Sequence, residues 1–449
     1  MFRGTMSVNG AGHLMIGGCD AVELAHRYGT PLYVLNEHIV RQRAQDYREA
    51  FAQFVPGSQV IYAGKALLTT ALCQIIAQEH LGLDVVSGGE LYTALAAGFP
   101  TEHIYFHGNN KSSQELSMAL DHHVGRIVVD NIYELEILQD LAAAQGITAD
   151  ILMRITPGVE PHTHSYIQTG QFDSKFGFPI NSEGTLDAIA VASRMPNLHL
   201  RGLHCHIGSQ ILELDSFTKT ARIMMTLLAK LRDTLGLNLD ELDLGGWLGI
   251  TCCVDDQPPS LTEYAQALGW AIADCCSQFR LPFPRISVEP GRSIVGEAGV
   301  TLYTIGSIKD IPGVRRYVAI DGGMADNPRV AIYQAKYTAC LVNKAQTEPM
   351  ELVTIAGKCC ESGDVLIRDI MLPAVEVGDI LAVFSTGAYN YSMASNYNRL
   401  PRPAMVIVWQ GESDIIVERE TYADLVRMDR IPPRLAGTQA VVVGRQRRV

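Results

Sequence analysis

Short apolar runs alternate with amphipathic stretches from about residue 58 to residue 290, the pattern of repeated strand–helix units. Eight runs are predicted as strands, at residues 60–63, 83–86, 104–106, 126–129, 151–155, 200–207, 242–244 and 286–289. Helical patterns lie between them at residues 67–79, 132–145, 185–195, 217–235 and 261–279, with Asp130 or Asn131 capping the second and Gly146 ending it. Eight parallel strands, each followed by a helix, predict a (β/α)8 TIM barrel.

The pattern changes after about residue 291, where helical periodicity fades. Extended runs follow one another at residues 317–320, 331–342, 352–355, 380–384, 405–409 and 415–418, with turn residues between them. This predicts a second, mostly β domain of the β-sandwich or Greek-key kind. The early run at residues 31–36 precedes the first strand–helix unit and is assigned to the same domain. We therefore predict a barrel over residues 37–290 and a β domain made of residues 1–36 and 291–449.

Composition narrows the class of protein. Of 449 residues, 47% are hydrophobic and 19% charged, which suits a large buried core. The net charge of −12 favours neither nucleic acid nor an anionic membrane as a partner, and no apolar run is long enough to predict a membrane span. The first residues lack the apolar core of a secretory signal. Ten cysteines, six of them in adjacent pairs, fit neither a disulfide framework nor a metal clamp, so we expect reduced thiols in the cytoplasm and no metal.

Polar and glycine-rich segments follow the ends of the predicted strands in phase. In chain order they are Lys65 and residues 87–90, 107–110, 204–206, 208–209, 245–246 and 289–292. In a TIM barrel the active site lies at the C-terminal ends of the strands, and the loops after strands seven and eight commonly hold a phosphate. These segments therefore predict one site at that face of the barrel.

Lys65 is the candidate that would anchor a cofactor. A lysine at a strand end is usually a solvated surface residue, but an amine inside a barrel mouth loses solvation. We expect its pKa to fall, which suits Schiff-base chemistry. Nearby, the segments at residues 208–209, 245–246 and 291–292 offer backbone N–H groups, a hydroxyl and a guanidinium. Each glycine pair alone is ordinary in a barrel turn; together they predict a phosphate site.

Three further side chains are candidates with ordinary alternatives. Glu289 ends a buried strand, so its carboxylate needs a partner: either the ring nitrogen of a cofactor or a nearby arginine such as Arg292. His206 and His204 are two apart and point to the same side of their strand. An imidazole there would stack on a cofactor ring or be a core histidine. Cys360 is either a reactive thiol or a buried inert one.

These segments make the sequence resemble the fold-type III pyridoxal-phosphate (PLP) decarboxylases, and among them the members that act on meso-2,6-diaminopimelate. The resemblance extends from residue 28 to residue 403. It is carried by YAGKA at 62–66, DVVSGGEL at 84–91, HTHSYIQTGQFDSKFG at 162–177, GLHCHIGSQ at 202–210, VEPGRSIV at 288–295, CESGD at 360–364 and GAYNYSMASNYN at 387–398. The HTH run and CESGD are specific, whereas the glycine-rich pieces are shared with ornithine and arginine decarboxylases. The family fold is a TIM barrel with a β-sandwich-like domain.

The resemblance implies a cofactor, PLP, and a role for each matching residue. Lys65 would carry PLP as a Schiff base, with His206 stacked on the ring and Glu289 facing its nitrogen. The other cofactor-binding residues implied are Ser87, Ser209, Gly245, Gly246, Gly291, Arg292 and Tyr389. The carboxylate-bearing end of the substrate would meet Arg292, Arg329, Tyr333 and Tyr389, and its distal amine Glu361. Cys360 would come from the second subunit of a homodimer and protonate the carbanion after CO2 leaves, giving L-lysine.

The sequence departs from the family pattern at three places. Trp247 replaces the usual third glycine after strand seven, where its ring could reshape the loop or narrow the pocket; Val330 replaces a proline and Cys359 a histidine. The alternatives are a decarboxylase of ornithine, lysine or arginine, an amino-acid racemase and an inactive PLP-binding protein. Arg329 favours a substrate with a distal carboxylate. The CESGD segment favours decarboxylation, and the presence of Lys65, Cys360 and Glu361 favours a working enzyme.

Overall fold

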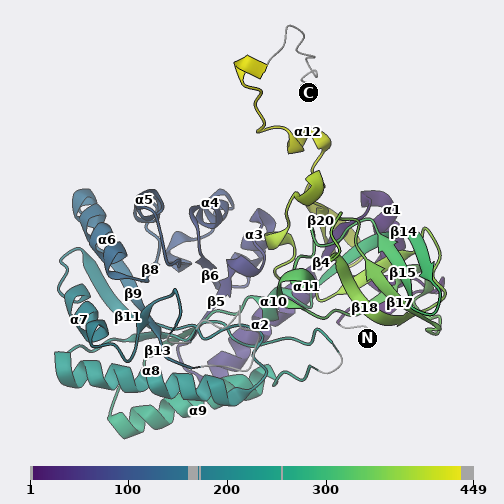
Figure 1. The fold of residues 1–449 in the computed structure, drawn as a ribbon. Helices are drawn as coiled ribbons and strands as arrows, with labels where there is room; N and C mark the ends of the chain where they lie inside the picture. Colours follow the sequence, from purple (N-terminus) through teal and green to yellow (C-terminus); the bar gives the residue numbers. More distant parts are fainter. Residues whose placement is uncertain (1–3, 160–169, 171–172, 254–255, 436–449) are drawn as a thin grey trace.

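A closed barrel of eight parallel strands forms one half of the molecule (Figure 1). The computed structural model describes residues 4–159, 170, 173–253 and 256–435. The strands are β5 (Gln59–Ala63), β6 (Gly82–Val85), β7 (Ile104–Phe106), β8 (Arg126–Val129), β9 (Ala149–Thr156), β11 (Leu198–His204), β12 (Glu241–Asp243) and β13 (Arg285–Val288). Each pairs with the next, and β13 pairs with β5 to close the ring. The predicted TIM barrel is confirmed.

Helices surround the barrel as the periodicity predicts. They are α3 (Thr70–Gln78), α4 (Gly88–Ala96), α5 (Ser113–Asp121), α6 (Ile132–Gln145), α7 (Glu183–Ala192), α8 (Leu214–Leu235) and α9 (Leu261–Phe279). The N-cap of α6 is Asn131, whose side chain accepts a hydrogen bond from the backbone of Glu134, and the helix ends at Gly146 with φ of +68°. Between these two residues the helix has the predicted bounds.

The last strand departs from the expected strand–helix pattern. After β13 there is only the single turn α10 (Arg292–Val295), and the ring of helices is completed by α2 (Glu37–Phe54), which precedes the barrel in sequence and packs on α9. Gly269 of α9 permits this packing, because a Cβ there would lie 2.3 Å from the carbonyl oxygen of Phe54. Because α2 covers this part of the barrel, the chain passes from β13 through α10 directly into β14 (Gly299–Ile311) of the second domain.

The second half of the molecule is a nine-stranded sheet of mainly antiparallel strands. It contains β4 (Leu32–Asn36), β14 (Gly299–Ile311), β15 (Arg315–Ile320), β16 (Ala339–Leu341), β17 (Glu351–Ala356), β18 (Val365–Leu372), β19 (Ile380–Phe384), β20 (Ala404–Trp409) and β21 (Glu412–Val417). The early strand β4 lies between β14 and β20, so its predicted place in this sheet is confirmed. A small sheet of β1 (Ser7–Val8), β2 (Leu14–Ile16) and β3 (Cys19–Asp20), with α1 (Ala21–Tyr28), precedes it.

Parts of the β domain differ from the sequence prediction. The long strand β14 was not predicted, because two glycines and a register shift between Ile305 and Ile308 interrupt its alternation. The run at residues 331–342 is not continuously extended. It begins inside the short helix α11 (Arg329–Tyr333), which follows Pro328 and ends at Gln334 in the left-handed conformation, and only β16 is a strand.

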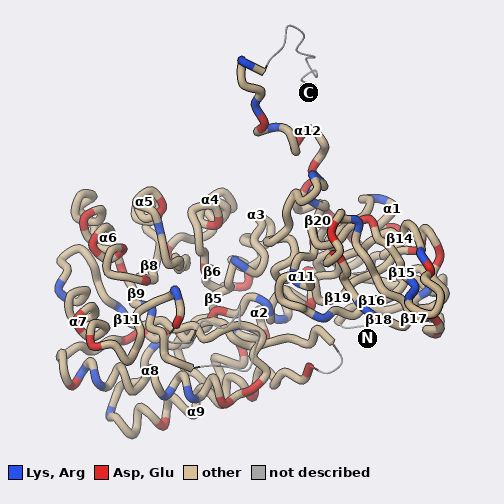
Figure 2. The backbone as a smooth tube through the Cα atoms, viewed as in Figure 1, with Lys and Arg blue, Asp and Glu red and all other residues tan. Residues whose placement is uncertain are grey.

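The sheet and the barrel are joined where β4 ends and α2 begins at the next residue. Asn36 ends β4, and its side chain caps α2 by accepting a hydrogen bond from Ile39, so the chain enters the barrel directly from the sheet. It returns between β13 and β14. Among the described helices, none is long and apolar enough to cross a membrane. Basic and acidic residues are interspersed along both halves in the view of Figure 2.

Candidate active site

A cavity of ≈ 480 Å³ lies at the C-terminal ends of the barrel strands. It brings together eight of the residues predicted for the site: Lys65, His206, Ser209, Glu289, Arg292, Arg329, Tyr333 and Tyr389. Arg329, Tyr333 and Tyr389 come from the β domain, Arg292 begins α10 directly after the last barrel strand, and the others come from the barrel. The cavity is therefore bounded by both halves of the chain.

Lys65 follows β5 in a short 3₁₀ turn and reaches the cavity from there. Its Nζ lies 3.5 Å from Oδ2 of Asp84, a fully buried residue of β6. Burial alone would lower the pKa of Lys65, but Asp84, Tyr389 and Glu289 raise it above its ordinary value. The expected fall of this pKa was wrong, because neighbouring negative charge outweighs desolvation.

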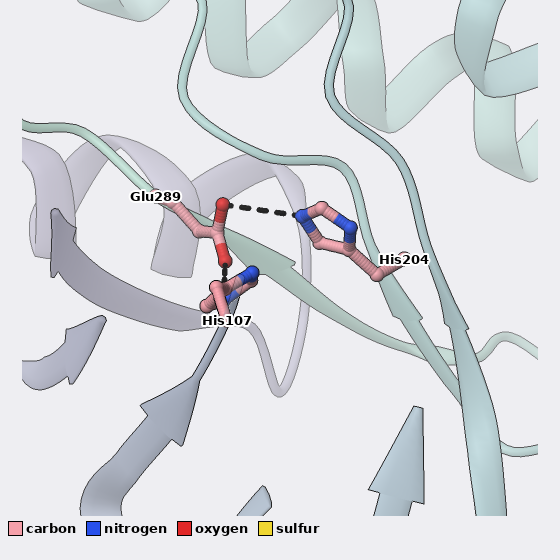
Figure 3. A group of neighbouring side chains, drawn as sticks. All are labelled: His107, His204 and Glu289. Atoms are coloured by element: carbon pink, nitrogen blue, oxygen red, sulfur yellow. Dashed lines mark hydrogen bonds and ion pairs between the residues drawn. The ribbon is translucent and has the colours of Figure 1, made fainter. Parts of the chain in front are cut away.

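Glu289 is held by two histidines (Figure 3). Nε2 of His107 lies 2.7 Å from Oε1, and Nε2 of His204 lies 3.3 Å from Oε2. All three side chains are buried. Burial raises the pKa of Glu289, but the opposing effect of His107 and His204 is larger, so the pKa lies well below its usual range. The alternative of an ion pair with Arg292 is not found among the described residues, since that guanidinium donates instead to Ser209, 3.2 Å away.

The two cavity histidines at the end of β11, His204 in the strand and His206 just after it, are uncharged near neutral pH. Burial lowers the pKa of His204 to about 3. Burial and the neighbouring charges of Lys65 and Arg154 lower the pKa of His206 well below its usual value. A neutral His204 beside an ionised Glu289 donates its Nε2 proton to that carboxylate.

A second part of the cavity is strongly basic. The guanidinium carbons of Arg292 and Arg329 lie 4.7 and 5.6 Å from the centre of the Tyr389 ring, and Arg329 also lies over Tyr333 at 5.2 Å. Burial, followed by the charge of Arg329, lowers the pKa of Arg292 to about 10. Two buried guanidiniums at one end of a cavity are suited to bind a carboxylate or phosphate.

The predicted glycines lie in tight backbone contacts at the strand ends. A Cβ on Gly246 would be 1.6 Å from the carbonyl oxygen of Glu289, and one on Gly291 would be 2.9 Å from the Cβ of Ala63. Gly245 has φ of +73°, which disfavours other residues. Ser87 caps α4 by accepting a hydrogen bond from the backbone of Glu90 at 3.2 Å and is not among the cavity-lining residues.

Cys360 and Glu361 do not line this cavity. They are exposed on the turn between β17 and β18. The backbone N–H of Cys360 donates to Oδ1 of Asn398 at 2.7 Å, and the hydroxyl of Tyr397 lies 3.5 Å from Glu361 Oε2. Within one chain, therefore, the structure does not bring these two residues to Lys65.

The three departures from the family pattern leave the cavity open. Trp247 is 1% exposed, stacks on Phe217 with ring centres 5.3 Å apart and is not among the cavity-lining residues. Its indole thus points into the barrel–helix layer and does not narrow the pocket. Val330 lies in α11. Cys359 is buried, and burial together with Asp364 raises the pKa of its thiol to about 12.

Sequence reasoning assigned no role to several residues that the cavity contains. They are His107, Asn109, Arg154, Lys175 and Phe176, and Asp84 lies beside Lys65. The signal for His107 was its place directly after the third strand, and Lys175 and Phe176 belong to the HTH–SKFG run. The first part of that run, at residues 162–169 and 171–172, lies outside the described residues.

Comparison with known proteins gives one consistent result. Residues 37–296 match the family model described as pyridoxal-dependent decarboxylase, pyridoxal binding domain. The chain is 53% identical over 427 residues to a diaminopimelate decarboxylase of Bacillus subtilis (strain 168), covering 95% of this chain and 97% of that one. It is 50% identical to one of Bacillus methanolicus over 93% of this chain and 97% of the other. The crystal structure of a diaminopimelate decarboxylase from M. jannaschii in complex with L-lysine superimposes with a TM-score of 0.90 at 39% identity, covering 96% and 99% of the two chains.

Proposed function

The chain belongs to the pyridoxal-dependent decarboxylase family, and from that membership we propose that it converts meso-2,6-diaminopimelate to L-lysine and CO2. The observation that carries the substrate is the pair Arg292 and Arg329, which share one cavity with Lys65. Ornithine, lysine and arginine have no second carboxylate for that pair to bind. This reaction is the last step of lysine biosynthesis.

The cavity has the groups that PLP requires. Lys65 offers a primary amine, Glu289 a buried ionised carboxylate and Ser209 with Arg292 a hydroxyl and a guanidinium for a phosphate. A Cβ on Gly246 would collide with the carbonyl oxygen of Glu289, and one on Gly291 would crowd Ala63, so both positions favour glycine. When bound, PLP supplies the electron sink for the pair left behind as CO2 departs.

Each cofactor-binding residue then has a defined task. Lys65 would attach the cofactor, His206 would stack on its ring and Glu289 would keep the ring nitrogen protonated. The phosphate region is bound by Ser209, Gly245, Gly246, Gly291, Arg292 and Tyr389. Ser87 acts from the start of α4, where it fixes the loop after β6.

The substrate is oriented by its distal end. Arg329 and Arg292 bind the carboxylate that is retained, with Tyr333 and Tyr389 packed against the guanidiniums. Glu361 binds the distal amine. Holding this end fixes which carboxylate faces the cofactor, so that only one of the two is lost.

We further propose a homodimer with shared active sites, in which Cys360 and Glu361 serve the cavity of the other subunit. The support is their exposure on the β17–β18 turn, outside their own cavity. Cys360 would donate the proton that replaces CO2. The cytoplasm is the proposed setting, since all ten cysteines are free thiols, as is usual in a reducing compartment.

The experiment is a substrate panel with the purified chain loaded with PLP. We expect CO2 from meso-diaminopimelate and none from lysine, ornithine or arginine. Lys65→Ala should lose both the visible absorption of the lysine-bound cofactor and the release of CO2, whereas the matched change at an exposed lysine, Lys219→Ala, should keep both. Equal release of CO2 from lysine would refute the substrate; no CO2 from any diamino acid would refute the activity.

A further inference from the structure

Two buried carboxyl groups lie at the ends of the neighbouring strands β12 and β13, and they have different partners. Oδ1 of Asp243 accepts a hydrogen bond from the backbone N–H of Gly245 at 2.8 Å. Glu289 instead has His107 at 2.7 Å from one oxygen and His204 at 3.3 Å from the other (Figure 3). The exposed fraction is 1% for Asp243 and 2% for Glu289, so burial does not distinguish them.

The different partners give the two groups opposite charge states. Burial and the adjacent Glu289 raise the pKa of Asp243 well above its usual value, so it keeps its proton. Burial also raises the pKa of Glu289, but the two histidines lower this pKa by more than burial raises it and keep the group ionised. Because one buried site does not readily hold two negative charges, the group with the better donors takes the charge.

His107 is held by contacts of its backbone, its ring and the residue that follows it. Its backbone N–H donates to Val85 at 2.8 Å, and its ring edge meets the ring of His204 with centres 4.8 Å apart. One residue further on, the carbonyl of Gly108 accepts from Nζ of Lys111 at 2.8 Å. Lys111 in turn is paired with Glu134 at 2.6 Å, deep in the protein. The ring therefore has little freedom to leave Glu289.

We propose that His107 is a positioning residue that makes Glu289, and not Asp243, the ionised carboxyl group at the floor of the cofactor cavity. The inference deepens the proposed function and rests on it in one respect, that Glu289 faces the ring nitrogen of PLP. A protonated Glu289 would lose its attraction for a protonated ring nitrogen, so the close contact between His107 and Glu289 sets the pH range in which this face of the cavity can bind it.

The other charged or titratable groups around Glu289 do not replace that contact. They are Lys65, Asp84, Arg154, His204, Cys205, His206 and Asp243. His204 contacts the opposite carboxylate oxygen and is neutral. Asp84 shares Nε2 of His107 with Glu289, but its Oδ1 lies 3.8 Å from that nitrogen against 2.7 Å for Oε1 of Glu289. Loss of His107 removes the shorter of the two imidazole contacts of Glu289, at 2.7 Å, and leaves only His204 at 3.3 Å, so the pKa of Glu289 rises.

The test is the dissociation constant of PLP for the full-length apoprotein, measured by absorbance and fluorescence between about pH 8 and pH 6. The matched pair is His107→Gln, whose amide N–H can reach the position of Nε2, and His107→Asn, whose shorter side chain cannot. In His107→Asn we expect binding to weaken with falling pH relative to wild type, by about tenfold per pH unit once Glu289 is protonated. At low pH the dissociation constant of PLP for His107→Asn should approach the value for Glu289→Gln. His107→Gln should follow wild type.

Asp243→Asn is the control for the neighbouring carboxyl, because an amide replaces a group that is already uncharged. It should keep the wild-type pH profile. The proposal is overturned if His107→Asn and His107→Gln give profiles parallel to wild type, or if Asp243→Asn reproduces the effect of Glu289→Gln. The measurement needs cofactor binding alone, so a failure of the substrate assignment would appear separately, as wild-type protein that binds PLP normally but releases no CO2 from diaminopimelate.

Discussion

Arg292 and Arg329 place their guanidinium groups against the same aromatic ring, that of Tyr389, with their carbons 4.7 and 5.6 Å from its centre. No ion pair joins either arginine to a carboxylate within the part of the chain that the structure describes. Bringing two buried like charges together is unfavourable unless an anion joins them. This absence of a carboxylate partner supports the proposal that the pair binds the distal carboxylate of the substrate.

Replacing Arg329 should weaken substrate binding more than it slows the chemistry. We expect Arg329→Gln to raise KM for meso-diaminopimelate by about 10- to 100-fold with a smaller change in kcat, since a charged hydrogen-bond pair contributes about 1.5–3 kcal/mol and lies away from the bond that breaks. Steady-state CO2 release measures both constants. Arg368→Gln, at an exposed position of β18, should change neither. An unaltered KM in Arg329→Gln would remove the carboxylate-binding role.

Cofactor loading should depend on the contact between Lys65 and Asp84. Their atoms lie 3.5 Å apart, and the carboxylates nearby raise the pKa of Lys65, so the amine carries a proton that it must lose to react. The rate at which apoprotein gains visible absorption with PLP should therefore rise with pH. In Asp84→Asn the rise should occur at lower pH, because one of the charges that stabilise the ammonium is gone. A rate independent of pH in wild type, or the same profile in both proteins, would contradict this.

The sequence predicts the parts of this site that lie in phase along the chain. Lys65, His206 and Glu289 each follow a strand, and the period of the barrel brings strand ends together. It does not predict which side chains meet across the barrel. His107 follows β7 and Glu289 follows β13, on different parts of the ring, and their contact depends on the closed geometry of the strands.

The direction of the Lys65 shift was missed for the same reason. Desolvation can be anticipated from a position inside a barrel, but the charge of Asp84 acts through a distance that only the structure supplies. Trp247 shows the converse: its identity suggested a narrowed pocket, whereas its stacking on Phe217 of α8 turns the indole away from the cavity.

Trp247 should act on stability and not on the pocket. Trp247→Gly removes a fully buried indole and its stacking on Phe217, which should lower the free energy of unfolding by about 3–5 kcal/mol. Trp247→Phe, which keeps an aromatic ring, should lose less. Urea unfolding of the apoprotein measures both, and KM for substrate should stay near wild type in any variant that remains folded. Tighter substrate binding in Trp247→Gly would show instead that the indole constricts the cavity.

The buried neutral histidine His204 should make the apoprotein less stable in mild acid. Its pKa is about 3 in the folded chain, whereas an unfolded histidine takes up a proton near pH 6.5. Below about pH 6.5 the unfolded state therefore binds more protons, and stability falls as pH falls. Urea unfolding at about pH 7.5 and pH 5.5 should show this loss in wild type and less of it in His204→Gln. His26→Gln, at an exposed position of α1, should keep the wild-type slope.

The separation of Cys360 from Lys65 predicts complementation between two inactive proteins. If Cys360 serves the cavity of the other subunit, a dimer of one Lys65→Ala and one Cys360→Ala chain contains one site with both groups intact. Random reassociation of equal amounts makes half of the dimers mixed, so about one quarter of wild-type activity should return. The matched control mixes Lys65→Ala with Lys65→Ala/Cys360→Ala, in which no intact site can form. Activity that stays at the level of that control after confirmed subunit exchange would mean that Cys360 does not act across the dimer.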